Sequence, residues 1–148
     1  MGRFQRLSGE PANMHTQKLR CEEDIHALTS KLWFILTTTD CIQQFFFGGD
    51  LFSDWRKDSS IFGDKEEKIP RGQVEEMIPG IYLGFRLDGI PELNLSSTTF
   101  EYEIVPSGDG IQLQLSIQAS ISSEELLKTL RQQCRMMVKK IKWLAEFS

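Results

Sequence analysis

The stretch 98-TTFEYEIVPSGDGIQLQLSIQASI-121 carries the clearest structural pattern of this 148-residue chain. Apolar and polar side chains alternate over residues 100–104 and again over residues 111–117. Such alternation is typical of strands with one buried side and one solvent-facing side. The residues between the two runs, 106–110, are rich in the Pro, Gly, Ser and Asp of tight turns. The stretch therefore predicts an antiparallel hairpin with one dry face.

A long helix is predicted directly after this hairpin, because the apolar period changes there from two residues to three and four. The sequence 122-SSEE-125 has the form of a capping box, in which Ser122 and Glu125 satisfy each other's backbone amides. The apolar stripe that follows is long and needs a broad apolar surface, which we expect the dry face of the sheet to provide. It consists of Leu127, Leu130, Cys134, Met137, Ile141 and Leu144.

Upstream of the hairpin, residues 18–25 alternate and predict a half-buried first strand. Two short helices are expected next, the first capped by Thr29 or Ser30, the second capped near Thr38 or Thr39 and ended by Gly48-Gly49. The remaining strands are expected at residues 51–55, 60–63, 72–78 and 81–87.

These elements together predict an α+β helix-grip fold. A curved antiparallel sheet of about seven strands wraps around the long C-terminal helix, and two short helices follow the first strand. Residues 1–15 combine Gly, Pro, Ser and charge without any period, so we expect a flexible N-terminal tail. Residues 16–148 are expected to form one domain, which their length and the chain's 40% hydrophobic content allow.

The composition limits the kinds of partner that the protein is expected to bind and the cell compartment in which it is expected to occur. A formal charge of −4 leaves no net basic field for nucleic acid. No apolar run approaches the roughly 20 residues needed to cross a bilayer, so no membrane insertion is expected. The N-terminus has no apolar core of the kind that a secretory signal needs, which predicts a cytoplasmic protein. The three widely spaced cysteines, Cys21, Cys41 and Cys134, predict reduced thiols rather than disulfides or a zinc site.

Several short motifs occur in a fixed order along the chain. They are 32-LWFILT-37 with Ile42 and 45-FF-46, then 53-SDW-55, 72-GQVEEMIP-79, 98-TTFEYEI-104, and Val138 with 141-IK-142 and 145-AE-146. This series resembles the START-like (SRPBCC, Bet v 1-like) superfamily. It is most similar to the branch named for activators of the ATPase of the ninety-kilodalton heat-shock protein. The resemblance covers about residues 17–147 and implies the same helix-grip fold.

The sequence departs from that family's pattern in two places. A Gly-Trp pair that often occurs in the last helix is replaced by Gln133-Cys134, and a glycine-rich turn is replaced by residues 56–60. Replacing tryptophan with cysteine predicts more room between the helix and the sheet.

An apolar cavity between sheet and helix is the binding site expected in a fold of this shape. Large, adaptable aromatic and thioether side chains suit such a lining, although plain core packing is the favoured interpretation for any one of them taken singly. The expected ligand-binding residues are Phe46, Phe52, Trp55, Phe62, Phe85, Phe100, Tyr102, Leu113, Leu115, Cys134, Met137 and Ile141.

One polar group is a candidate for the same cavity. Glu76 has the parity of Val74 in its strand and would point inward, where desolvation raises the pKa of a carboxyl group. The interpretation that we favour is a solvated or hydrogen-bonded carboxylate near a strand end or bulge. The two histidines, His15 and His26, have no metal-binding spacing, and no nucleophile motif occurs. We therefore expect no metal, no cofactor and no catalytic residues.

Three functions are compatible with this sequence. The first is non-enzymatic binding of a small apolar or amphipathic molecule. The second, implied by the resemblance, is a module that binds a chaperone and alters its ATPase cycle. The third is an enzyme of the cyclase or aromatase type, for which only Glu23, Glu76 and Tyr102 offer acid–base chemistry. A homodimer through an edge strand or the long helix is compatible with all three.

Overall fold

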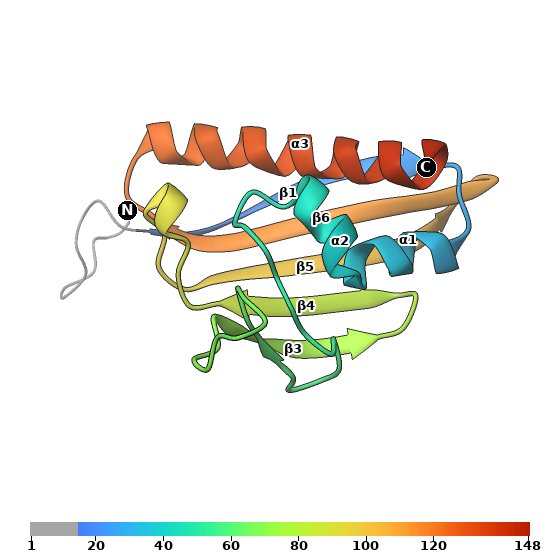
Figure 1. Cartoon of the computed structure of the whole chain (residues 1–148). Helices are drawn as coiled ribbons and strands as arrows, with labels where there is room; N and C mark the ends of the chain where they lie inside the picture. The colour runs from blue at the N-terminus through green and yellow to red at the C-terminus, as the bar shows by residue number, and fades with distance from the viewer. Residues whose placement is uncertain (1–14) are drawn as a thin grey trace.

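A single antiparallel sheet organises the protein, with its strands in the order β1-β6-β5-β4-β3-β2. The computed structural model describes residues 15–148. The predicted tail, residues 1–15, lies outside the described residues except for His15, which opens β1. Figure 1 shows the long helix α3 running along one side of the sheet, while the two short helices lie beside it.

The elements follow the predicted order. They are β1 (His15–Ile25), α1 (Thr29–Thr37), α2 (Thr39–Phe45), β2 (Ser60–Ile61), β3 (Gly72–Ile78), β4 (Tyr82–Leu87), a short 3-10 turn (Pro91–Leu93), β5 (Thr98–Ser107), β6 (Gly110–Ile121) and α3 (Glu124–Phe147). The predicted α+β helix-grip fold is confirmed.

The hairpin of β5 and β6 has the predicted turn region and the predicted dry face. Ser107 pairs with Gly110, so Gly108 and Asp109 form a two-residue turn, and Gly108 adopts a positive φ of 58°. On the inner face Phe100 and Leu115 are fully buried. Alternation therefore located both strands correctly, because each has one face against the core and one against solvent.

The sheet has six strands rather than about seven. Residues 51–55, expected as a strand, contribute only one isolated bridge, between Phe52 and Phe62. The extended conformation is broken at Trp55, whose φ of 54° lies in the left-handed region. β2 is likewise reduced to two residues. This segment therefore runs as a loop, and its composition does not reveal that.

The N-terminal cap of α3 lies one residue later than predicted. Ser123, not Ser122, is the cap, and its hydroxyl oxygen accepts a hydrogen bond of 3.1 Å from the backbone N–H of Leu126. Ser122 is the residue between the end of β6 and this cap. Either serine can serve as an N-cap, but only Ser122 has a glutamate three residues later, so the capping-box pattern selected the wrong one.

The cap predicted for the first short helix is wrong, whereas Thr38, one of the two residues predicted for the second, does occupy the N-cap position. Leu28 and Thr38 precede α1 and α2, and neither side chain caps its helix. The hydroxyl of Thr39 instead donates to the carbonyl of Leu51 at 2.9 Å. That bond ties the start of α2 to the loop that follows it.

The C-terminal end of α3 is fixed to the end of β1. A carboxylate oxygen of Glu146 accepts hydrogen bonds from the backbone N–H of His26 at 2.8 Å and from Lys142 at 3.0 Å. Both contacts stabilise the charged carboxylate and lower its pKa. α3 is thus fastened at both ends while its apolar stripe packs on β1 and β6.

The two serines before α3 give a matched test of the cap. We expect Ser123→Ala to lower the free energy of unfolding by about 1 kcal/mol, because it removes the acceptor for the Leu126 amide. Ser122→Ala should change it by less than about 0.5 kcal/mol. Urea unfolding followed by circular dichroism measures both. A larger loss for Ser122→Ala would contradict the observed cap.

Candidate ligand-binding site

A cluster of aromatic rings lies where α2 and the loop after it meet β4 and β5. Phe85 of β4 and Phe100 of β5 are stacked, with ring centroids 5.1 Å apart and planes 16° apart. Phe46, at the end of α2, packs edge-on against Phe100 at 5.3 Å, and Trp55 packs edge-on against Phe85 at 5.6 Å. Three segments that are distant in sequence thus build one apolar surface inside the fold.

Trp55 brings a polar atom into this cluster. Its side chain is only 5% exposed, and its indole Nε1 is buried with no hydrogen-bond partner among the described residues. A buried donor left without a partner costs about 1–3 kcal/mol, so such atoms are rare in folded proteins. The backbone also holds Trp55 in place, because its own N–H donates to the hydroxyl oxygen of Ser53 at 3.0 Å. The indole N–H is therefore available to an acceptor outside the described residues.

Tyr102 is the second polar residue of the cluster. It is 2% exposed, and its ring centroid lies 6.3 Å from that of Phe85. Burial raises the pKa of its phenol, and the nearby Cys134 raises it further. The hydroxyl therefore stays neutral at physiological pH and cannot act as a phenolate base.

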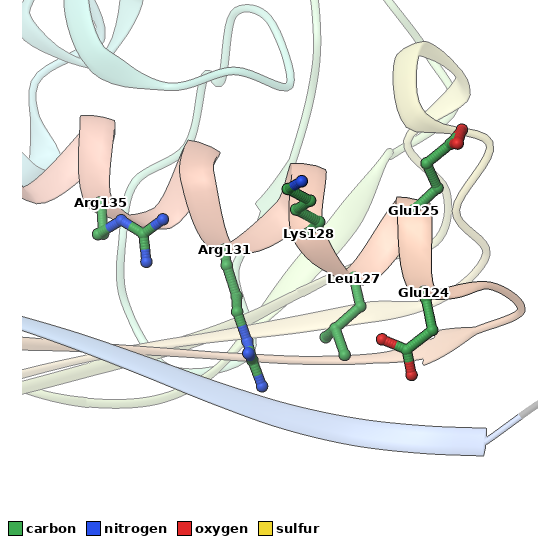
Figure 2. Close-up of a pocket in the computed structure, with 6 residues that line it drawn as sticks. All are labelled: Glu124, Glu125, Leu127, Lys128, Arg131 and Arg135. Carbon is green, nitrogen blue, oxygen red and sulfur yellow. The ribbon is translucent and has the colours of Figure 1, made fainter.

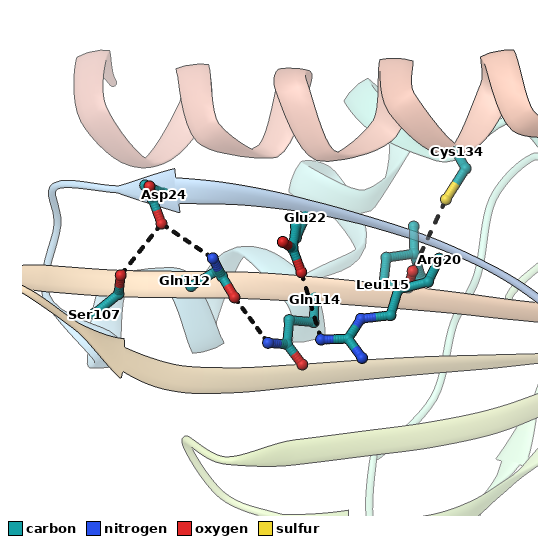
Figure 3. Close-up of polar contacts among 8 residues, drawn as sticks. All are labelled: Arg20, Glu22, Asp24, Ser107, Gln112, Gln114, Leu115 and Cys134. Atoms are coloured by element: carbon teal, nitrogen blue, oxygen red, sulfur yellow. Dashed lines mark hydrogen bonds and ion pairs between the residues drawn. The ribbon is translucent and has the colours of Figure 1, made fainter.

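Cys134 closes the interior from the helix side. It is fully buried on α3, and its thiol donates to the carbonyl of Leu115 at 3.9 Å, as Figure 3 shows. Burial, followed by a hydrogen bond with Cys21, raises the pKa of the Cys134 thiol. Cys134 is thus a packed thiol that contacts the sheet backbone, not a reactive thiolate.

The predicted lining residues occupy two places. All of them except Phe52 and Phe62 are buried in the core. Phe52 and Phe62 are half-buried and line an open cleft of about 500 Å³ next to Ser53 and Asp54. This cleft borders the loop that carries Trp55.

One aromatic residue of the cluster was missed by the sequence reasoning. The ring centroid of Phe47 lies 5.2 Å from that of Phe46 and 6.0 Å from that of Phe100. The run of three phenylalanines before Gly48-Gly49 is the pattern from which it could have been found.

Glu76 does not point into the interior. A β-bulge between Val74 and Glu76 shifts the alternation of β3 by one residue. Glu76 therefore lies opposite Gly84 on the outer face, where its side chain is 51% exposed and pairs with Lys57 at 3.6 Å. After the bulge Met77 takes the inward position. The inward interpretation of Glu76 assumed an unbroken strand and is wrong, whereas the favoured interpretation, a solvated carboxylate near a bulge, is confirmed.

Residues 15–148 contain neither a candidate metal cluster nor a candidate membrane-spanning helix. Within residues 15–148, no three His, Cys, Asp or Glu side chains lie close enough together to hold a metal ion. None of the helices in this range is long and apolar enough to cross a membrane.

A second cleft, of about 560 Å³, lies beside the first half of α3 (Figure 2). Five of its six lining residues are charged, and Leu127 is the apolar one; Figure 2 shows Arg131 extending toward β1. A lining of this kind suits a polar ligand better than an apolar one. The aromatic interior near Trp55 therefore remains the candidate site for an apolar molecule.

The curved antiparallel sheet, the long C-terminal helix and the two short helices after β1 define the helix-grip class of fold. A scan against protein-family models and a search of curated proteins found no match. Solved structures do match over most of the chain, at low sequence identity.

The solution structure of the Aha1 dimer from Colwellia psychrerythraea is 15% identical, with a TM-score of 0.69 over 88% of this chain and 97% of that one. ChR145 from Cytophaga hutchinsonii is 20% identical, with a TM-score of 0.66 over 86% and 92%. CalU16 from Micromonospora echinospora is 17% identical, with a TM-score of 0.64 over 86% and 65%. The predicted resemblance to START-like proteins with Aha1-like relatives is therefore confirmed for the fold.

The bulge in β3 gives a matched test of which side chains face inward. We expect Glu76→Gln to change the free energy of unfolding by less than about 0.5 kcal/mol, because an exposed ion pair contributes little. Val74→Thr should lower it by about 1–3 kcal/mol, because it places a hydroxyl on the fully buried side of the strand. Thermal and urea unfolding measure both changes. A loss at Glu76 as large as that at Val74 would show that Glu76 is buried.

Proposed function

We propose that this protein binds a small apolar molecule that carries one hydrogen-bond acceptor, in the interior next to Trp55, between the inner face of β4 and β5 and the segment that follows α2. It holds the molecule without changing it chemically. The observation that supports this most is the buried indole Nε1 of Trp55, which has no partner among the described residues. A carbonyl or ether oxygen on the ligand would accept from that N–H and remove the cost of leaving it unsatisfied.

The surroundings of that atom support an apolar body for the ligand. Phe46, Phe85 and Phe100 offer ring faces and edges, which favour a flat apolar molecule that packs beside them. The cleft at Phe52 and Phe62 borders the Trp55 loop and is the route of entry that we propose. Entry there would require the loop over residues 53–59 to shift.

Binding is favoured over catalysis by the positions of the acid–base candidates. Glu76 lies on the outer face and is paired with Lys57. Glu23 is half-buried on the edge strand β1, and Tyr102 is held in its neutral form. A cyclase-type reaction would have to rely on the shape of the site alone, so it stays the third proposal.

A protein-interaction module, such as the resemblance implies, is the second proposal. One observation favours it: α3 exposes large apolar side chains on its outer side, among them Trp143 at 51% and Phe147 at 71%. Exposed apolar surface of this kind is often a contact surface for another protein.

Two probes of the same shape test the leading proposal. 2-Acetylnaphthalene has a carbonyl acceptor, and 2-isopropenylnaphthalene has a methylene group in its place. We expect the ketone to bind about tenfold more tightly, which corresponds to one buried hydrogen bond of about 1.4 kcal/mol. Titration followed by tryptophan fluorescence gives both dissociation constants.

Two tryptophan variants complete this test. Trp55→Phe should remove the preference for the ketone while leaving the hydrocarbon's affinity within about threefold. Trp33→Phe, which alters a half-buried indole on α1 outside the cluster, is the matched control and should keep the preference. Equal binding of both probes to the wild-type protein, or binding of neither, would contradict the proposal.

A further inference from the structure

A groove of about 620 Å³ runs between α2 and the outer side of α3, and it shares only Phe46 and Phe47 with the aromatic cluster of the proposed ligand site. The end of α2 and the turn after it form one wall, and the second half of α3 forms the other. Its lining residues are Gln44, Phe45, Phe46, Phe47, Gln133, Met136, Lys139, Lys140 and Trp143.

Two large apolar side chains of α3 are exposed along this groove. Met136 is 55% exposed and Trp143 is 51% exposed, although the apolar stripe of the same helix is buried on the sheet. They are seven residues apart, which is about 10.5 Å along a helix. Phe147 extends the exposed surface, with its ring 6.2 Å from that of Trp143. The groove therefore offers two apolar contact points at a fixed spacing.

All the charged side chains that line the groove are positive. Lys139 and Lys140 lie in its lining, and no carboxylate does. Lys140 lies over the Trp143 ring at 4.9 Å, so its charge sits at one of the two apolar contact points. Glu146, the acidic residue of the last turns of α3, is already engaged by Lys142 and by the His26 amide. The lysines of the groove are left to pair with charges from another molecule.

We propose that this groove binds an acidic amphipathic helix of another protein. Its apolar residues, at i and i+7, would contact Met136 and Trp143, and its carboxylates would pair with Lys139 and Lys140. A second copy of this chain fits less well, because a two-fold axis through the groove would bring the same lysines together. An anionic membrane fits less well too, because the surface is concave. This inference does not depend on the interior ligand site.

A synthetic helix can test the groove directly. The probe is a fluorescein-labelled peptide of about 15 residues with leucines at i, i+4 and i+7 and glutamates on its other sides. A second peptide has lysine in place of every glutamate. We expect the acidic peptide to bind at least about tenfold more tightly than the basic one, measured by fluorescence anisotropy, and to bind more weakly at higher salt.

Variants on the two halves of α3 locate the binding surface. Lys139→Glu with Lys140→Glu should weaken the acidic peptide by at least about tenfold and strengthen the basic peptide. Trp143→Ala should weaken the acidic peptide by about tenfold or more, because it removes one apolar contact point. Lys128→Glu with Arg131→Glu makes the same charge change beside the other cleft of α3 and should alter binding by less than about threefold. All of these positions except Trp143 are charged surface sites, and circular dichroism checks folding.

Several outcomes would overturn the proposal. Equal affinity for the two peptides, or equal losses in the two charge-reversal pairs, would show that the groove does not select an acidic helix. If analytical ultracentrifugation shows a dimer of the wild-type protein that is lost in Trp143→Ala, the groove binds a second copy of this chain. The protein could instead bind neither peptide but sediment with phosphatidylserine vesicles, in a way that depends on Lys139, Lys140 and Trp143. That result would show that the groove binds a membrane. Interior ligand binding would be unaffected in each case.

Discussion

The packing of α3 against the dry face of the sheet is the contact on which the rest of the structure depends. Leu130, Cys134 and Ile141 are fully buried along that helix. Full burial of one such aliphatic side chain stabilises the fold by about 1.5–3 kcal/mol, which far exceeds any single surface ion pair. The cap at Ser123 and the carboxylate of Glu146 fix the two ends, so the helix has one position along β1 and β6.

This placement explains where the aromatic cluster forms. Because α3 packs on β1 and β6, it leaves the inner face of β4 and β5 to be covered by other parts of the chain. α2 supplies Phe46, and the loop after it supplies Trp55 through a left-handed backbone turn. The cover is thus a loop and a helix end rather than a regular element. Such cover is easier to displace than a packed helix, which suits a site that must open to admit a ligand.

Most of the fold could be predicted from the sequence because it rests on periodic burial. The period of two located β5 and β6, and the stripe from Leu127 to Leu144 located α3. Features that break the periodic pattern could not be predicted from the sequence. The bulge before Glu76 reversed its direction, and the left-handed turn at Trp55 turned an expected strand into a loop.

The candidate site was predicted only in part for the same reason. The alternation of apolar and polar residues correctly predicted that Phe85, Phe100 and Tyr102 point inward, because they lie on regular strands. Whether a buried polar atom has a partner depends on the surrounding three-dimensional packing, so the free N–H of Trp55 left no trace in the sequence.

A high-resolution crystal structure of the protein, purified from its source without refolding, tests the central claim most directly. The account predicts electron density for an apolar molecule between the Trp55 loop and the inner face of β4 and β5, with an acceptor atom within about 3.2 Å of the Trp55 indole Nε1. Density for one ordered water on that nitrogen, with the rings of Phe85 and Phe100 closely packed and no further molecule beside them, would contradict it.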